Sequence, residues 1–421
     1  MRYNRTEIAP NIGFSSVIDE KFKTGSLVVR FITGLSGEYA AANALGTGAL
    51  SSSSARYRTL AELNEKLSSL YGAALSTFAR KRGDIQILGL TASWLNKKYA
   101  FDGEDVDAEM RELIRGCIFK PNVQDGCFDA ASYSITRKDL IDHIDAELNN
   151  KRGYAISRAG EIAFAGEPAE FSCYGTKTAA AAVTSAEAYQ AYRKLLRASQ
   201  IEIFYVAPEE DPGFIEMFRE SFAAIDRAPA EVAFRSISPL KTEVAEGSDE
   251  FDVRQCKMVM TFKSASEDFF ALKLLSTIFG ETPVSKLFMN VREKMSLCYY
   301  CASRLVSPKG AVMVDSGVER GNIEKARAEI INQLDEIKNG NISDSELESA
   351  MLSLENALNQ IGDTPSSYSS WYFERFCDGQ IKTPAEQLAD YRNVTKERII
   401  EAAKSLSLDS VYLMLDKEAA E

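Results

Sequence analysis

Histidine is almost missing from this sequence of 421 residues, because it occurs once, at position 143. Zinc sites and nucleophile–base pairs usually combine a histidine with further ligands or a nucleophile at defined spacing. His143 lies in the charged segment RKDLIDHIDAE, without partners of the right type. We therefore expect His143 to be a solvated helix residue, and the sequence offers no nucleophile–base pair for catalysis.

Cysteine and long apolar runs are also scarce. The seven cysteines are scattered and odd in number, which argues against a disulfide framework. The first ten residues, MRYNRTEIAP, lack the apolar region of a secretion signal, and no run approaches the roughly 18 apolar residues of a membrane span. We therefore expect a cytoplasmic location and no membrane partner.

Positive charge is in deficit, with a formal net charge of −12. Nucleic acids and anionic membranes require a basic field, so neither is expected as the main partner. The chain is 45% hydrophobic and 26% charged, which is typical of a soluble globular protein. Its length exceeds that of one ordinary hydrophobic core and predicts at least two domains.

The pattern of the first half predicts an alternation of strands and helices. Residues 27–35 (LVVRFITGL) form a β-branched run typical of a buried strand. Thr59 and Glu62 form a capping box for the helix that ends at Gly72. Residues 74–80 and 85–94, separated by the turn sequence KRGD, predict a β-hairpin, and helical patterns, a strand and a helix follow up to residue 225.

The second half repeats this order after a polar, proline-bearing and acidic stretch. Residues 63–90 match residues 288–317 as helix, short turn, strand, basic turn with glycine, and strand. We therefore predict an α+β fold of two homologous domains, each a mainly antiparallel sheet with helices packed on one side. The predicted boundaries are residues 1–225 for the first domain, 226–252 for a linker and 253–421 for the second domain.

One motif of the second half resembles a known family. The segment SKLFMNVREKMSLCYY is similar to the C-terminal-domain signature of the M16 metallopeptidases, the insulinase, pitrilysin and mitochondrial processing peptidase family. The capped helix that ends in LYGA, with its following hairpin, resembles the part of the N-terminal domain just after the zinc motif of that family. The resemblance extends over essentially the whole chain and implies one half of an M16-type clamshell.

The zinc motif of the family is degenerate here. Active M16 enzymes carry His-x-x-Glu-His on a helix, in which the histidines bind zinc and the glutamate is the general base. Counting back from Thr59 places that motif at Ala44-Leu45-Gly46-Thr47-Gly48, so Ala44, Thr47 and Gly48 stand at the functional positions. No glutamate occurs between Glu112 and Glu147, where the family has its third ligand. We expect no zinc, no other cofactor and no catalysis by the isolated chain.

The substrate-binding pair of the family is retained. The resemblance assigns substrate binding to Arg292 and Tyr299. A guanidinium group can bind peptide oxygens bidentately, and a tyrosine hydroxyl can donate to the oxyanion of amide hydrolysis. The resemblance therefore implies a non-catalytic subunit that binds peptide and completes the chamber of a zinc-bearing paralogue with the His-x-x-Glu-His motif, as a heterodimer.

Several alternatives remain open at this level. The chain could be a peptide-binding or scaffolding protein without a protease partner, or a homodimer. Residues Ala74 to Arg80 could bind peptide as an added strand if they form a sheet edge, which the sequence does not reveal. Cys298 and Cys301 form a C-x-x-C pair; on a regular strand their sulfur atoms would point to opposite faces, so we expect two small buried side chains.

Overall fold

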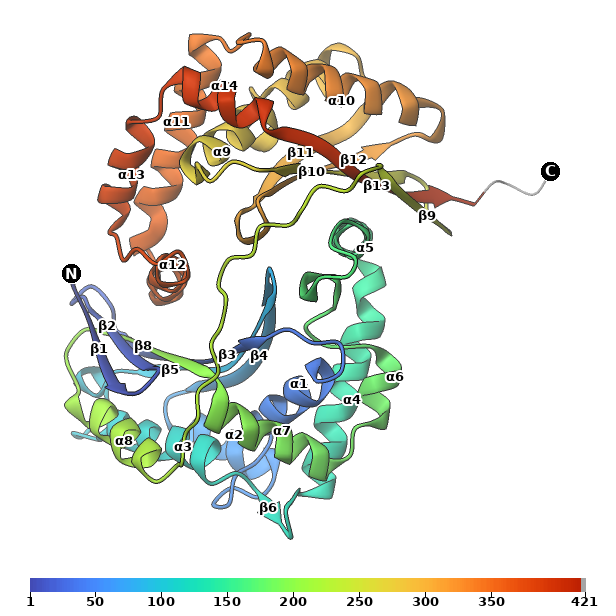
Figure 1. The fold of residues 1–421 in the computed structure, drawn as a ribbon. Helices are drawn as coiled ribbons and strands as arrows, with labels where there is room; N and C mark the ends of the chain where they lie inside the picture. Colours follow the sequence, from blue (N-terminus) through green and yellow to red (C-terminus); the bar gives the residue numbers. More distant parts are fainter. Residues whose placement is uncertain (418–421) are drawn as a thin grey trace. The chain divides into compact units, whose positions relative to one another are not determined.

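The computed structural model describes residues 1–417, which divide into two compact units with one main sheet each. Unit 1 consists of residues 1–146, 171–233 and 362–377. Unit 2 consists, within the described chain, of residues 147–170, 234–361 and 378–417. Figure 1 shows both sheets edge-on with helices against them.

Unit 1 contains a six-stranded sheet with the order β1-β2-β8-β3-β5-β4. Its strands are β1 (Arg2–Ala9), β2 (Ile12–Ile18), β8 (Gln200–Ala207), β3 (Thr24–Gly34), β5 (Ile85–Leu95) and β4 (Ala74–Arg82). Neighbouring strands are antiparallel, except that β2 and β8 are parallel. The two central strands, β3 and β8, are rich in β-branched and aromatic residues, which suits strands buried on both faces.

Helices of the first half cover one face of this sheet. They are α1 (Ala40–Gly48), α2 (Leu60–Ser69), α3 (Val106–Phe119), α4 (Ala130–Ala146), α6 (Lys177–Ala182), α7 (Ser185–Ala198) and α8 (Pro212–Ala223), with a small hairpin β6–β7 (Val123–Gln124 and Cys127–Phe128) between α3 and α4. The predicted capping box of α2 is present: Thr59 Oγ1 accepts from the backbone N–H of Glu62 at 3.2 Å, and the Glu62 carboxylate accepts from the N–H of Thr59 at 3.3 Å. Leu27, Val29 and Phe31 of β3 point into the core on this side.

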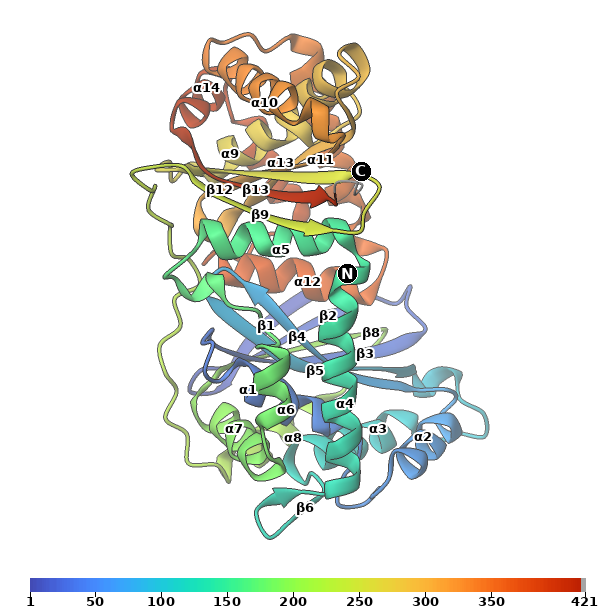
Figure 2. The ribbon, with the colours of Figure 1, turned by 90° about the vertical axis from the view of Figure 1, so that its right-hand side faces the viewer.

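A single helix from the second half, α12 (Pro365–Cys377), covers the opposite face of the unit 1 sheet (Figures 1 and 2). Tyr372 of α12 stacks on Tyr3 of β1 with ring centroids 3.9 Å apart. Phe373 lies under the guanidinium group of Arg30 from β3, with 4.5 Å between the guanidinium carbon and the ring centroid. This second layer is therefore aromatic and cationic, unlike the aliphatic core on the other face.

Unit 2 contains a five-stranded sheet with the order β11-β12-β10-β13-β9. Its strands are β11 (Cys298–Val306), β12 (Ala311–Val318), β10 (Cys256–Ser264), β13 (Leu406–Asp416) and β9 (Ala245–Phe251). Only the pair β13–β9 is parallel. The five strands β4-β5-β3-β8-β2 of unit 1 have the same order and directions, so the two sheets confirm the repeat that the sequence predicts.

The helices of unit 2 follow the same plan. Those of the second half are α9 (Phe269–Ser276), the wide-turn π-helices η5 (Thr277–Glu281) and η6 (Leu287–Lys294), α10 (Ile323–Lys338), α11 (Asp344–Asn359), α13 (Pro384–Arg392) and α14 (Lys396–Lys404). A helix of the first half, α5 (Lys151–Ala163), lies on the other face of the unit 2 sheet (Figure 2). Its small residues Ala155 and Ala159 pack against Val259 and Tyr412.

The predicted α+β class with mainly antiparallel sheets is confirmed, but three details differ. Helices are not confined to one side, because α12 and α5 cover the second faces. The compact units are not the continuous segments 1–225 and 253–421, since each includes one helix from the other half. Residues 245–251 of the predicted linker 226–252 form β9; its sequence, AEGSDEF, has alternately exposed side chains and little hydrophobic signal.

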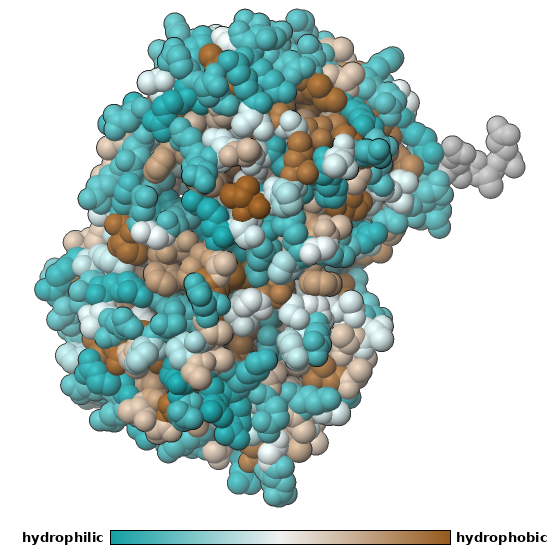
Figure 3. Space-filling model, in the orientation of Figure 1, coloured by the Kyte–Doolittle hydropathy of each residue, from teal (hydrophilic) through white to brown (hydrophobic). Residues whose placement is uncertain are grey.

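The surface agrees with the composition. The face drawn in Figure 3 is largely hydrophilic, with hydrophobic residues exposed in separate small groups. None of the helices in the part of the chain that the structure describes has the length and apolar character required to cross a membrane.

Candidate functional site

The residues Ala44 to Gly48, which the resemblance equates with a zinc motif, lie on α1 in unit 1. Gly46 faces α7 so closely that a Cβ atom there would lie 2.4 Å from the carbonyl oxygen of Ala188. Ala44 and Thr47 are buried, and the Thr47 hydroxyl has no hydrogen-bond partner. At the positions that the resemblance equates with two ligands and a base, the side chains are thus a methyl group, a hydroxyl-bearing group and a hydrogen atom, and none of them is a usual zinc ligand or general base.

Helix α4 completes this region from the opposite side. A Cβ atom on Gly48 would lie 2.9 Å from the Thr136 methyl carbon, so α4 fills the space that a ligand side chain at position 48 would need. The Thr136 hydroxyl donates to the carbonyl of Ser132 at 3.2 Å and accepts from the Ser52 hydroxyl at 2.9 Å. The space beside Gly48 is therefore occupied by the short hydroxyl side chains of Thr136 and Ser52.

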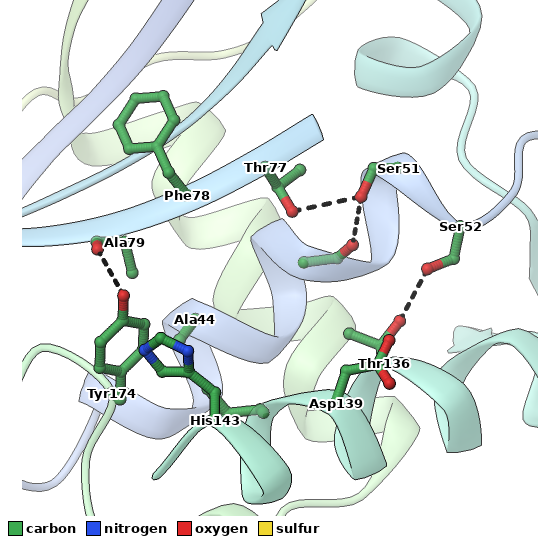
Figure 4. Close-up of a pocket in the computed structure, with 12 residues that line it drawn as sticks. Ala44, Ser51, Ser52, Thr77, Phe78, Ala79, Thr136, Asp139, His143 and Tyr174 are labelled. Carbon is green, nitrogen blue, oxygen red and sulfur yellow. Dashed lines mark hydrogen bonds between the residues drawn. The ribbon is translucent and has the colours of Figure 1, made fainter. Parts of the chain in front are cut away.

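A cavity of about 320 Å³ remains beside the motif (Figure 4). Its walls come from α1, the segment that follows it, β4, α4 and Tyr174. Ser51 bonds both the carbonyl of Gly48 and the Thr77 hydroxyl, each at 3.2 Å. This first cavity is small, is lined by hydroxyl groups and by apolar side chains such as Phe78, and is uncharged along most of its wall, with Asp139 and His143 at one side.

The single histidine belongs to this wall. The His143 ring is exposed but lies against Tyr174, with ring centroids 4.5 Å apart, and the Tyr174 hydroxyl donates to the carbonyl of Ala79 at 3.1 Å. His143 is a solvated helix residue, as predicted, but its contact with Tyr174 and its place in the cavity wall were not predicted. The signal was the spacing of Ser132, Thr136, Asp139 and His143, which puts four polar side chains on one face of α4. Within residues 1–417, no three His, Cys, Asp or Glu side chains form a group able to hold a metal.

Strand β4 is at the edge of the unit 1 sheet, which answers the question that the sequence left open for Ala74 to Arg80. Its side chains alternate between the two faces. Thr77 and Ala79 line the first cavity, whereas Arg80 points to the face covered by α12. Phe78 crosses over Gly89 of β5, where a Cβ atom would lie only 2.6 Å from the Phe78 ring.

The predicted substrate-binding residues lie in unit 2. Arg292, in the last turn of η6, stacks on the Phe288 ring at 4.6 Å and has a loose contact of 3.5 Å with Glu293. Tyr299 is 63% exposed, and its hydroxyl donates to Glu319 at 3.3 Å. Both polar groups are at the surface of unit 2, and in the described chain no hydrogen bond joins them.

The C-x-x-C pair differs from the prediction. The register of β11 against β12 shifts between Cys298 and Tyr300, so Tyr299 is an extra residue in a β-bulge. Cys298 and Cys301 consequently face the same hydrophobic core instead of opposite sides. A hydrogen bond between the thiols lowers the pKa of Cys298 and, together with burial, raises the pKa of Cys301. The prediction of two buried small side chains is confirmed, and the predicted geometry is wrong.

Comparison with known proteins shows which family the chain resembles. Residues 182–354 match the family model described as the peptidase M16 inactive domain. The chain is 27% identical over 406 residues to the probable inactive metalloprotease YmfF of Bacillus subtilis, with 95% of each protein covered. In this comparison the chain is similar to the M16 peptidases, and the relative is itself described as probably inactive.

Solved structures show how widely this M16 fold is shared. A conserved protein from Enterococcus faecalis V583 is 26% identical, with full coverage of both chains and a TM-score of 0.91. The peptidase M16 inactive domain of Pseudomonas fluorescens is 16% identical over the full length of both chains, with a TM-score of 0.80. A protease from Helicobacter pylori is 13% identical with a TM-score of 0.78, covering 99% of this chain and all of that one. At such low identity, the last two similarities describe the M16 fold alone.

Proposed function

We propose that this chain is a non-catalytic M16 subunit that binds peptide and completes the chamber of a zinc-bearing paralogue. The observation that carries the proposal is the contrast between the residues at the expected zinc position and the residues expected to bind substrate. The zinc locus holds only Ala44, Thr47 and Gly48, whereas Arg292 and Tyr299 retain their side chains at an exposed surface. In a shared site, the partner supplies zinc and the base, and this chain supplies substrate contacts.

The state of Arg292 and Tyr299 supports such a role. The Arg292 guanidinium group is stacked on Phe288, which orients its plane, and its carboxylate contact with Glu293 is too long to be a strong ion pair. The Tyr299 hydroxyl lies on a bulge that turns its side chain outward from β11. Both groups are therefore accessible for hydrogen bonds to peptide oxygens.

The edge strand supports peptide binding by the chain itself. An extended peptide can pair with β4 through main-chain hydrogen bonds, because β4 ends the order of the unit 1 sheet. The first cavity lies directly beside Thr77 and Ala79 and can receive a side chain of that peptide. The zinc locus is thus a peptide-binding feature without chemistry.

A reconstitution experiment tests the proposal. The purified chain is mixed with a paralogue from the same genome that carries His-x-x-Glu-His, and peptide cleavage is followed by fluorescence. Neither protein alone should cleave, whereas the mixture should. Arg292→Ala and Tyr299→Phe should each lower kcat/KM of the mixture by about 10- to 1,000-fold, as expected when a substrate or oxyanion contact is lost.

Arg304→Ala provides the matched control, because Arg304 is an exposed arginine on the same strand, β11. It should leave the activity unchanged. Full activity of the mixture with both Arg292→Ala and Tyr299→Phe would contradict the assigned roles. Cleavage by the isolated chain would contradict the division of labour.

A second candidate function is a peptide-binding or scaffolding protein without a protease partner, as a monomer or homodimer. It is favoured by the location of β4 and the first cavity within one unit of this chain, because peptide binding there requires no second protein. Size-exclusion chromatography of the mixture distinguishes the two functions. We also propose a cytoplasmic location, which the seven free cysteines support.

A further inference from the structure

A second cavity of unit 1 lies on the other face of β4. It has a volume of about 460 Å³ and is enclosed by β3, β4, β5 and the first turns of α12. Four basic side chains line it, namely Arg30, Arg80, Lys81 and Arg82, together with one acidic side chain, Glu374. Glu374 is paired with Arg82 at 2.8 Å, so this basic cavity carries an excess of positive charge in a chain whose net charge is −12.

Arg30 gives the basic cavity a built anion-binding group. Its side chain is only 7% exposed, and Nη2 donates to the Ser369 hydroxyl at 2.8 Å. Nη1 is buried without a hydrogen-bond partner, and no carboxylate of residues 1–417 lies within ion-pair distance of this guanidinium group. Burial lowers the pKa of Arg30 to about 10, as expected for a buried cation without a close counter-ion.

Arg80 connects this cavity to the edge strand. It is an exposed residue of β4 whose guanidinium carbon lies 5.6 Å from the Phe78 ring centroid. Thr77 and Ala79 line only the first cavity and Arg80 lines only the basic cavity, as the alternation of side chains along a strand implies, whereas Phe78 lines both. A peptide paired with β4 extends the same pleated sheet, so its side chains also alternate between these two sides.

We propose that β4 selects acidic peptides, with an Asp or Glu side chain of the bound peptide directed toward Arg80 and Arg30 in the basic cavity. The inference rests on the proposed peptide binding at β4 and names its substrate class. A carboxylate is an acceptor for guanidinium and hydroxyl donors, and Arg80, Arg30 and the serines of α12 offer both kinds. Because the net charge of the chain is −12, an acidic peptide is repelled by the protein as a whole. The positive charge of the basic cavity is what would favour its binding at β4.

Binding of labelled peptides to the isolated full chain, measured by fluorescence anisotropy, tests the inference. Three peptides of equal length, acetylated and amidated, carry Glu, Gln or Lys at alternate positions. The Glu peptide should bind about five- to twenty-fold more tightly than the Gln peptide, and the difference should shrink as salt increases. Arg80→Gln should remove most of this preference, whereas Arg56→Gln, an equal change of charge at an exposed position of unit 1, should preserve it.

The outcomes separate this inference from the proposed function. Equal binding of the Glu and Gln peptides, or an unchanged preference in Arg80→Gln, would overturn acidic selection while leaving peptide binding intact. Binding of none of the peptides would instead contradict peptide binding at β4. A preference that appears only when the C-terminal carboxylate is left free would assign the basic cavity to the peptide terminus and overturn the side-chain form of the proposal.

Discussion

The ammonium group of Lys309 lies 2.6 Å from a carboxylate oxygen of Glu167, and the lysine side chain is completely buried. Glu167 belongs to the segment 147–170 that the first half contributes to unit 2, while Lys309 precedes β12. The Ser238 hydroxyl also donates to Glu167. This ion pair therefore attaches the end of the segment 147–170 to the residues that lead into β12 of the unit 2 sheet.

Removal of one partner should be costly because the other charge stays buried. Lys309→Met should lower the free energy of unfolding by about 3 kcal/mol, measured by urea denaturation. The double variant Lys309→Met/Glu167→Gln should be more stable than the single variant, which gives a coupling energy of at least about 1 kcal/mol. Lys404→Met, which removes an exposed pair with Glu401, should change stability by less than about 0.5 kcal/mol. Additive effects of the two substitutions would contradict a buried pair.

Zinc content is the direct test of the degenerate motif. The purified chain should contain no stoichiometric zinc by mass spectrometry, and titration with zinc should give no specific binding isotherm, since Ala44, Thr47 and Gly48 offer no ligand. His143→Ala should behave identically, because His143 has no partners for a metal site in the described chain. One zinc ion per chain, lost in His143→Ala, would reveal a site that the sequence and the structure both miss.

Two helical glycines, Gly46 of α1 and Gly116 of α3, should respond in opposite ways to substitution by alanine, because only Gly46 is packed closely against another helix. Gly46→Ala should destabilise unit 1 by about 1–3 kcal/mol, because the new methyl group meets the Ala188 carbonyl oxygen at 2.4 Å. Gly116→Ala on α3 should be stabilising by about 0.5–1 kcal/mol, since the nearest atom is 3.9 Å away and alanine favours helix. Thermal unfolding followed by circular dichroism measures both. Equal effects would mean that α1 moves freely against α7.

Asp268 predicts a pH-dependent contribution to stability. It caps α9 by accepting from the N–H of Ala271 at 3.1 Å and pairs with Arg398 at 2.8 and 2.9 Å. Burial raises the pKa of Asp268, but the hydrogen bonds from Arg398 and the backbone outweigh it, so the net pKa lies below the ordinary 3.8. A depressed native pKa means that its stabilisation is present above pH 3.8 and is lost as the pH falls through the native value.

Asp268→Asn keeps a capping side chain and removes the charge. Relative to the unaltered chain, it should cost roughly 0.5–1 kcal/mol at pH 7, because the pair is partly exposed, and less as the pH falls below about 4. Urea unfolding across this range measures the difference. A cost that grows toward acidic pH would contradict the sign of the pKa shift.

Hydrophobic periodicity and capping signals predicted the interior of both units. Strands β3 and β8 are apolar runs, and the capping box predicted at Thr59 forms. Each of these features depends on residues that are close in sequence. For the same reason, the repeat was predictable as an order of elements even at low identity between the halves.

Features that depend on distant parts of the chain were not predictable. Strands β1 and β9 are edge strands with alternately exposed polar side chains, so they lack an apolar signal. The bulge at Tyr299 follows from the pairing register of β11 with β12, which no local pattern specifies. The basic cavity requires α12 to lie on a sheet whose strands come much earlier in the sequence, as in the contact between Arg30 and Ser369, which are 339 residues apart.

The exchange of α5 and α12 couples the order of synthesis to the order of folding. On the ribosome, the unit 1 sheet has all its strands once residue 207 has emerged, but α12 ends only at Cys377. Until then Arg30, Phe204 and Tyr3 lack their aromatic cover. In unit 2 the order is reversed: α5 is synthesised before all the strands that it covers, so its buried face has no partner until those strands have emerged. Neither half of the chain reaches its native state as a nascent domain, and the final step of folding is common to both.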